Sequence, residues 1–70
     1  MRRMEVDSAS LASVGYDARS RTLEVEFRSG AVYQYAGVPF GVARALARAE
    51  SIGGYFARFV RNAYDYIRVE

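Results

Sequence analysis

The chain has 70 residues, the length of one small domain, and a chain of this size buries only about 60% of the surface that it exposes when unfolded. It contains no cysteine and no histidine, which excludes a disulfide framework and a zinc site of the usual kind. Its 10 basic and 8 acidic residues give a net charge of +2. No stretch approaches the roughly 20 apolar residues of a membrane span, and no signal peptide is recognisable, so we expect a cytoplasmic protein without membrane contact.

The N-terminal part of the chain divides at residue 14. Residues 1–13 are mostly small or polar and predict a weakly ordered arm, whereas residues 14–70 are expected to form a single domain. Val14 and Tyr16 alternate with Gly and Asp, which predicts a short first strand. Residues 22–27 alternate more clearly, with apolar side chains on one face and Thr and Glu side chains on the other. This pattern predicts a half-buried second strand.

The turn after this strand decides which face of the sheet is apolar. A two-residue loop would require a positive φ at both Ser29 and Gly30, whereas a three-residue loop requires it only at Gly30. We therefore expect the three-residue loop, which places Val25 opposite Tyr33. A slip by one residue would invert every side chain of the strand. The expected register gathers five side chains on one face: Leu23, Val25, Phe27, Tyr33 and Tyr35.

Two helices are predicted after the sheet. Pro39 has the fixed φ of a first helical position, and residues 40–49 show apolar side chains at helical spacing. Ser51 is a suitable N-cap for a second helix over about residues 52–62. The expected apolar faces are Phe40, Ala43, Leu46 and Ala47 in the first helix and Ile52, Tyr55, Phe56, Phe59 and Val60 in the second. The last residues alternate again, which fits either a short closing strand or an extended arm.

These elements predict an α+β fold, in which a three-stranded antiparallel meander precedes two α-helices packed on one face, with a short C-terminal strand as one option for the tail. The helices must cover the tyrosine-bearing face, because a lone sheet of this size is only marginally stable. The opposite face carries Glu24 and Glu26 and is expected to be open to solvent.

Catalytic chemistry has few candidates in this sequence. Histidine, cysteine and lysine are all absent, so the usual general base, thiolate nucleophile and Schiff-base amine are missing. Glu24 and Glu26 lie side by side, and a carboxylate pair can perform acid–base work, but a flat exposed face favours a solvated surface. Gly53-Gly54 lacks the strand and the lysine of a phosphate loop and is better explained by close approach of two helices. We expect no enzyme activity, no cofactor and no metal.

Every basic residue is an arginine, which reflects codon bias or suits phosphate recognition. Arg44 and Arg48 are four residues apart on the first predicted helix, so they share one face and repel each other. Arg58 and Arg61 share a face of the second helix, and only Arg61 has an acidic partner at helical spacing, Asp65. Such a surface is typical of an anion-binding patch. Counter-charges from elsewhere in the fold would instead make it an ordinary solvated face.

The tyrosines are the other candidates for binding. Tyr33 and Tyr35 could stack on bases, as aromatic residues do on RNA-binding sheets, but the predicted register turns both rings toward the helices and favours the core. Tyr64 and Tyr66 lie in the tail near Arg61 and are expected to be partly exposed. Aromatic rings interleaved with arginine suit single-stranded nucleic acid. They equally suit packing of the tail on the domain.

Several segments of residues 8–68 together form a recognisable series, centred on Tyr33-Gln34-Tyr35. The others are Ser10 followed by residues 14–17, then residues 23–27, Gly30, Val38-Pro39, residues 49–56, Val60-Arg61 and Tyr64. In order and spacing they resemble the KTSC domain, which occurs at the C-terminus of some lysyl-tRNA synthetases and as a small stand-alone bacterial protein. The lack of lysine and the start Arg2-Arg3 are not part of that pattern. The family has no assigned function, so the resemblance implies little about activity, and RNA binding has been suggested for the family from its attachment to a synthetase.

Two hypotheses for function follow. The first is a non-catalytic RNA-binding (tRNA-binding) module, in which phosphates contact Arg44, Arg48, Arg58 and Arg61, and bases stack on Tyr64, Tyr66 or the pair Tyr33 and Tyr35. The second is a protein-interaction or self-assembly module that uses an open sheet edge. We expect a monomer rather than an oligomer.

Overall fold

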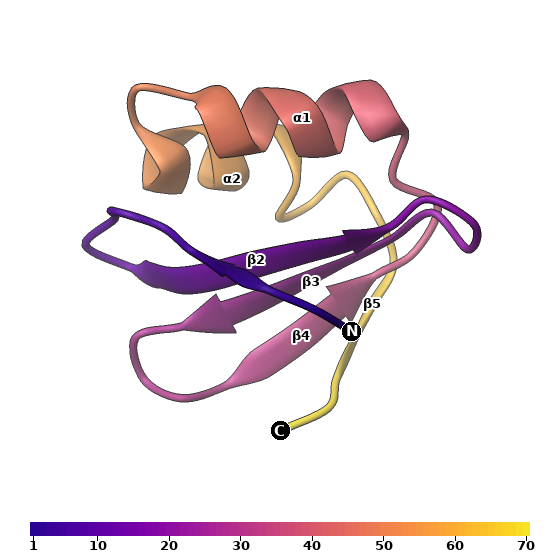
Figure 1. Cartoon of the computed structure of the whole chain (residues 1–70), viewed down its shortest axis with the longest axis horizontal. Coiled ribbons are helices and arrows are strands. Elements are labelled where there is room, and N and C mark those ends of the chain that lie inside the picture. The colour runs from indigo at the N-terminus through magenta and orange to yellow at the C-terminus, as the bar shows by residue number, and fades with distance from the viewer.

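A computed structural model describes residues 1–70 and shows a sheet covered on one face by two helices (Figure 1). The five antiparallel strands lie in chain order, so β1 and β5 are the two edges. The strands are β1 (Met4–Glu5), β2 (Leu11–Asp17), β3 (Thr22–Phe27), β4 (Val32–Tyr35) and β5 (Tyr66–Arg68), and the helices are α1 (Phe40–Arg48) and α2 (Ile52–Phe59). The predicted α+β fold is therefore confirmed, and the C-terminal tail is a strand paired with β4.

The predicted register between β3 and β4 is also confirmed. Val25 pairs with Tyr33 and Leu23 pairs with Tyr35. The N–H of Phe27 donates to the carbonyl of Ala31 at 2.9 Å, which closes the three-residue loop. Gly30 has a φ of +97°, a conformation that a residue with a β-carbon rarely adopts. The tyrosine-bearing face consequently lies under the helices, as expected.

The N-terminal segment differs from the prediction of a weakly ordered arm. Residues 4–5 form β1, and β2 begins at Leu11 rather than at Val14. Met4 pairs with Val14, and the chain before it crosses over the sheet at Gly15 (Figure 1). A β-carbon at Gly15 would overlap the backbone carbonyl of Arg2. The segment therefore lies against the sheet at Gly15 and pairs with β2, although most of residues 1–10 are exposed.

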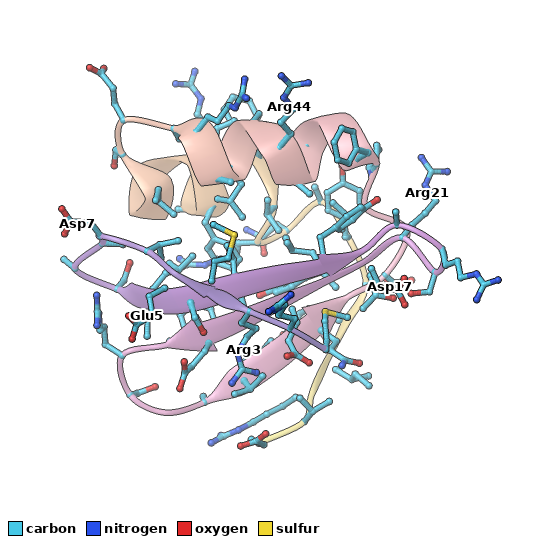
Figure 2. All side chains as sticks on the ribbon, viewed as in Figure 1. Arg3, Glu5, Asp7, Asp17, Arg21 and Arg44 are labelled. Carbon is cyan, nitrogen blue, oxygen red and sulfur yellow. The ribbon has the colours of Figure 1, made fainter.

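The expectation that the glutamate face is open to solvent is wrong at Glu24. Its side chain is buried, with only 6% of the residue exposed. Arg3 donates from Nη1 to Oε2 of Glu24 at 2.6 Å, and Gln34 donates from Nε2 to Oε1 at 2.8 Å. Figure 2 shows Arg3 lying over the strands. Arg3 belongs to the crossing N-terminal segment and is 21 residues from Glu24 in the chain. No local sequence pattern therefore predicts this ion pair.

The two helices are shorter than predicted and bury fewer of their apolar residues. Pro39 is the N-cap of α1, one position before its predicted place, and Ser51 caps α2 as expected by accepting from the N–H of Gly54 at 3.1 Å. Phe40 and Phe59 were both predicted on apolar faces, but both are exposed. Phe59 packs instead against Tyr55 of the same helix, at a centroid distance of 4.7 Å.

The core lies between the helices and the tyrosine-bearing face of the sheet. A β-carbon at Gly53 would meet the Ser10 side chain. This glycine therefore allows close approach of the N-terminal segment, and not of the neighbouring helix as we expected. No helix is long and apolar enough to cross a membrane. The buried apolar cluster consists of Leu11, Val14, Leu23, Val25, Tyr35, Val38, Ala43, Leu46, Ile52, Phe56 and Val60.

Candidate functional site

A groove with a volume of about 630 Å³ opens on one side of the molecule. It lies where the end of β3 and its turn, β4, the end of α2 and β5 come together. Pairing of β5 with β4 brings Tyr66 beside Tyr35, and the turn after β3 closes the other side. We call it the aromatic groove. Its lining residues are Ser10, Phe27, Arg28, Ser29, Ala31, Tyr33, Tyr35, Phe56, Arg61, Asn62 and Tyr66.

Five rings from four elements pack against one another in this groove. Phe56 of α2 meets Phe27 and Tyr35 edge-to-face, at centroid distances of 5.4 and 5.5 Å. Tyr66 packs across both tyrosines of β4, 5.4 Å from Tyr33 and 5.5 Å from Tyr35. Tyr35 and Phe56 are buried at the base, whereas 55% of Tyr66 is exposed. The groove thus presents aromatic surface that the protein itself only partly covers.

The tyrosine hydroxyls of the groove have no partner within the protein. Tyr16 is the only tyrosine whose hydroxyl forms a hydrogen bond, to the carbonyl of Val38 at 2.6 Å. No buried side-chain polar atom in the chain lacks a partner. The hydroxyl of Tyr35 must therefore touch solvent, although only 3% of the residue is exposed, and Tyr35 lines the groove. Together with Tyr33 and Tyr66, it offers three free hydrogen-bonding groups to a ligand.

The pKa of Tyr35 is raised above its ordinary value. Burial is the largest cause, and the neighbouring phenols of Tyr66 and Tyr33 add to it, while the charge of Arg61 acts in the opposite direction. The phenol of Tyr35 consequently keeps its proton at neutral pH and remains able to donate a hydrogen bond.

Two arginines border the groove without an acidic partner. The only ion pair of the protein joins Arg3 to Glu24. Arg28 donates to two carbonyl oxygens, from Nε to Ser8 at 3.1 Å and from Nη2 to Val6 at 3.2 Å. The side chain of Arg61 donates no hydrogen bond, and its Cζ lies 5.7 Å from the Phe56 ring centroid. Both positive charges are therefore available to an anion.

The structure separates the predicted binding residues into different places. Arg61 and Tyr66 line the aromatic groove, whereas Arg44 points away from the sheet on the outer side of α1 (Figure 2). Arg48 follows one turn later and is also exposed. Arg58 lies over the Phe59 ring, with its Cζ 5.6 Å from the centroid. The four arginines predicted on the helices thus have no ion-pair partners, but only Arg61 lines the groove, and it lies after the end of α2 rather than on the helix.

The remaining predicted residues also differ in their surroundings. Tyr64 is half-buried and packs against the core. Tyr35 belongs to the core as expected, and Tyr33 is half-buried at the groove wall. Asp65 does not pair with Arg61, because α2 ends at Phe59 and the helical spacing that we assumed does not apply.

Sequence reasoning gave no binding role to seven of the 11 residues that line the groove. Phe27 and Phe56 were predicted only as core, and Arg28 and Asn62 were given no binding role. The chain does hold one signal for Arg28, since it directly follows a strand and precedes the turn at Gly30. Its approach to the end of α2 depends on how the sheet and helices pack, which no local pattern shows.

The opposite face of the sheet carries a second polar arrangement, around Glu24. Burial alone would raise the pKa of its carboxyl, but hydrogen bonds from Gln34 and Arg3 and the positive charge of Arg3 outweigh burial, so the pKa lies below its ordinary value. Ser13 donates to Glu26 beside it at 2.7 Å. No group of three or more acidic side chains is placed to hold a metal ion. This arrangement ties the N-terminal segment to the sheet.

We expect acid to weaken the fold through Glu24. A carboxyl whose pKa is lowered in the folded state stabilises it above its unfolded pKa, about 4.3, and loses that contribution as the pH falls through the folded pKa. Urea unfolding between about pH 7 and pH 3 should show a steeper loss of stability for the native chain than for Glu24→Gln. Parallel curves for the two proteins would contradict the assigned role of Glu24.

Comparison with known proteins decides the family. The family model of the KTSC domain matches residues 7–64 of the chain. The chain belongs to the KTSC domain family. The resemblance found in the sequence is therefore confirmed.

KTSC relatives occur both alone and inside larger proteins. An uncharacterized protein of Stutzerimonas stutzeri (strain A1501) is 45% identical over 71 residues and covers all of both chains. The crystal structure of a KTSC domain protein from Yersinia pestis is 32% identical, with a TM-score of 0.96 over 99% of this chain and 97% of that one. A lysine–tRNA ligase of Trichormus variabilis is 41% identical over 51 residues, 73% of this chain but only 9% of the enzyme.

Proposed function

We propose that this KTSC protein is a non-catalytic module that binds single-stranded RNA in the aromatic groove. The observation that carries the proposal is the combination, in one hollow, of exposed aromatic surface, three unpartnered tyrosine hydroxyls and two arginines without acidic partners. Stacking of bases on aromatic rings and pairing of arginine with phosphate are the two contacts that single-stranded nucleic acids use most.

The charge of the groove rim supports an anionic ligand. No acidic side chain lines the groove, and both charged residues that do are arginines, Arg28 and Arg61. An arginine guanidinium suits phosphate because it presents several donors in a planar fork. The relatives are consistent with this ligand, since the chain matches a segment of an enzyme named lysine–tRNA ligase. We transfer only the association with RNA, and not the activity of that enzyme.

The salt dependence of RNA binding tests this function. Two arginines that each neutralise one phosphate predict a slope of about −1.4 for log K against log salt on single strands. Direct contacts from all four helical arginines would predict a slope of about −3. Fluorescence anisotropy with a labelled single-stranded RNA, repeated over a salt series, measures this slope. An absence of binding at low salt would refute the function, and equal affinity for a duplex would refute recognition of unpaired bases.

The open edge of the sheet favours a second candidate function, in protein association. Ile67 and Val69 are exposed on and beside the edge strand β5, and an unpaired edge can accept another strand. Sedimentation at high salt separates the two functions, because apolar association persists there while phosphate contacts weaken. We propose that the isolated chain is a monomer and expect a single sedimenting species of monomer mass.

A further inference from the structure

The size and lining of the aromatic groove indicate which part of an RNA it binds. Its volume of about 630 Å³ is that of a site for one small ligand. The β3–β4 turn bounds it on one side and the segment after α2, together with β5, on the other. A channel that tracks a strand would continue past these walls. The groove therefore has the dimensions of a pocket for one unit of a chain.

Its chemistry discriminates among ligands that aromatic pockets take. A cluster of rings can bind a quaternary ammonium group, but Arg28 and Arg61 would repel a cation here, and no carboxylate lines the groove to offset them. A purely apolar ligand would leave the free tyrosine hydroxyls and the Asn62 amide without water or partners, which is unfavourable. The ligand that fits combines a flat ring, hydrogen-bonding edges and a negative charge.

We infer that the groove accepts one unpaired nucleotide, with its base against Tyr33 and Tyr66 and its phosphate on Arg61. This inference rests on the proposed function and specifies its ligand. A base satisfies both kinds of group in the groove, because its face stacks on the rings and its edge meets the hydroxyls and Asn62. The base must be unpaired, since pairing and stacking in a duplex hide its faces.

The two arginines of the groove have different roles. Arg28 already uses two of its nitrogens on the carbonyls of Ser8 and Val6, so it is fixed in place as part of the wall. The guanidinium of Arg61 donates no hydrogen bond and lies over the Phe56 ring. Its full set of donors is free to face a phosphate, and this makes it the main anion contact.

A phosphorylated aromatic side chain of a protein is the closest competing ligand. A phenyl ring with a phosphate would stack and pair with Arg61 equally well. It has no hydrogen-bonding edge, however, and would leave the tyrosine hydroxyls and Asn62 unpartnered in the groove. The number of free polar groups at the groove therefore favours the nucleotide.

The test uses adenosine 5′-monophosphate, adenosine, inorganic phosphate and phenyl phosphate, each titrated into the full chain and followed by NMR of the tyrosine ring protons. We expect the monophosphate to shift the rings of Tyr33, Tyr35 and Tyr66 and to bind about tenfold more tightly than adenosine, because a charge-assisted hydrogen bond is added. Inorganic phosphate alone should leave the rings unchanged. Arg61→Ala should remove the difference between monophosphate and adenosine, whereas Arg58→Ala, in the last turn of α2 and outside the groove, should keep it.

Three outcomes would overturn the inference. Equal affinities for monophosphate and adenosine would remove the phosphate contact, and tighter binding of phenyl phosphate would assign the groove to a phosphorylated protein. The third is the absence of ring shifts with the monophosphate. If single-stranded RNA still binds at the groove in that case, the inference fails while the proposed function stands. If RNA also leaves the protein unchanged, both fail.

Discussion

Replacing Phe56 by alanine is expected to lower the free energy of unfolding by about 3–5 kcal/mol, the usual cost of removing a buried phenylalanine ring. Only 1% of Phe56 is exposed, and its ring contacts those of Phe27 and Tyr35 edge-to-face. A domain of this length has a total stability of only about 3–10 kcal/mol. A large fraction of the variant should therefore be unfolded at room temperature.

Phe59→Ala is the matched control for Phe56→Ala. Phe59 lies three residues later in the same helix, but 48% of it is exposed. It contacts Tyr55 at a centroid distance of 4.7 Å and lies under Arg58, contacts worth about 1 kcal/mol together. Urea unfolding of the two variants measures the difference. Equal losses of stability would show that the two rings share the core, contrary to the structure.

Replacing Tyr66 by alanine is expected to weaken binding of single-stranded RNA by about tenfold or more, since stacking of one base on an aromatic ring contributes about 1–3 kcal/mol. The side chain is more than half exposed, so the fold should survive its loss. Tyr66→Phe keeps the ring and removes only the hydroxyl. It should retain most of the affinity if stacking is the main contribution.

Arg61→Ala should weaken RNA binding by a similar factor, whereas Arg44→Ala should change it by less than about twofold. Both residues are helix-associated arginines without ion-pair partners, but Arg44 points outward from α1 (Figure 2). Each variant loses one positive charge, so a difference between them reports the position of the arginine relative to the RNA. A larger effect of Arg44 than of Arg61 would place the RNA on the outer side of α1, as the sequence alone had suggested, and would remove the groove from the account of binding.

The parts of the fold that local chemistry dictates were predictable. Gly30 provides the one positive φ that a three-residue loop requires, and the register of β3 and β4 followed from it. Ser51 has the side chain of an N-cap and accepts the expected hydrogen bond. Each of these features depends on residues close together in the chain, so the sequence pattern contains the necessary information.

The features that the sequence did not reveal depend on contacts between distant segments. Arg3 reaches Glu24 only because the N-terminal segment crosses the sheet at Gly15. Helical spacing predicted both Phe56 and Phe59 on the apolar face of α2, but only Phe56 is buried in the core, whereas Phe59 packs on Tyr55 at the surface. Such contacts carry no local signature that periodicity can detect.

The candidate site was predictable only in part, for the same reason. Arg61 and Tyr66 were named from their exposure and chemistry, and both line the groove. Arg44 and Arg48 were grouped with Arg61 because only one of the four arginines predicted on the helices had an acidic partner at helical spacing. Helical spacing indicates which residues share a face of one helix. It does not indicate how two helices are oriented toward the sheet. The groove itself exists only after β5 pairs with β4 and brings Tyr66 across Tyr33 and Tyr35.

The most direct test of RNA binding in the aromatic groove is an NMR titration of the isotope-labelled chain with a short single-stranded RNA at low salt. The predicted result is a set of shifted amide and ring resonances centred on Tyr33, Tyr35, Arg61 and Tyr66, which diminish as salt is added. Shifts confined to the outer side of α1 around Arg44, or no shifts at all, would contradict it.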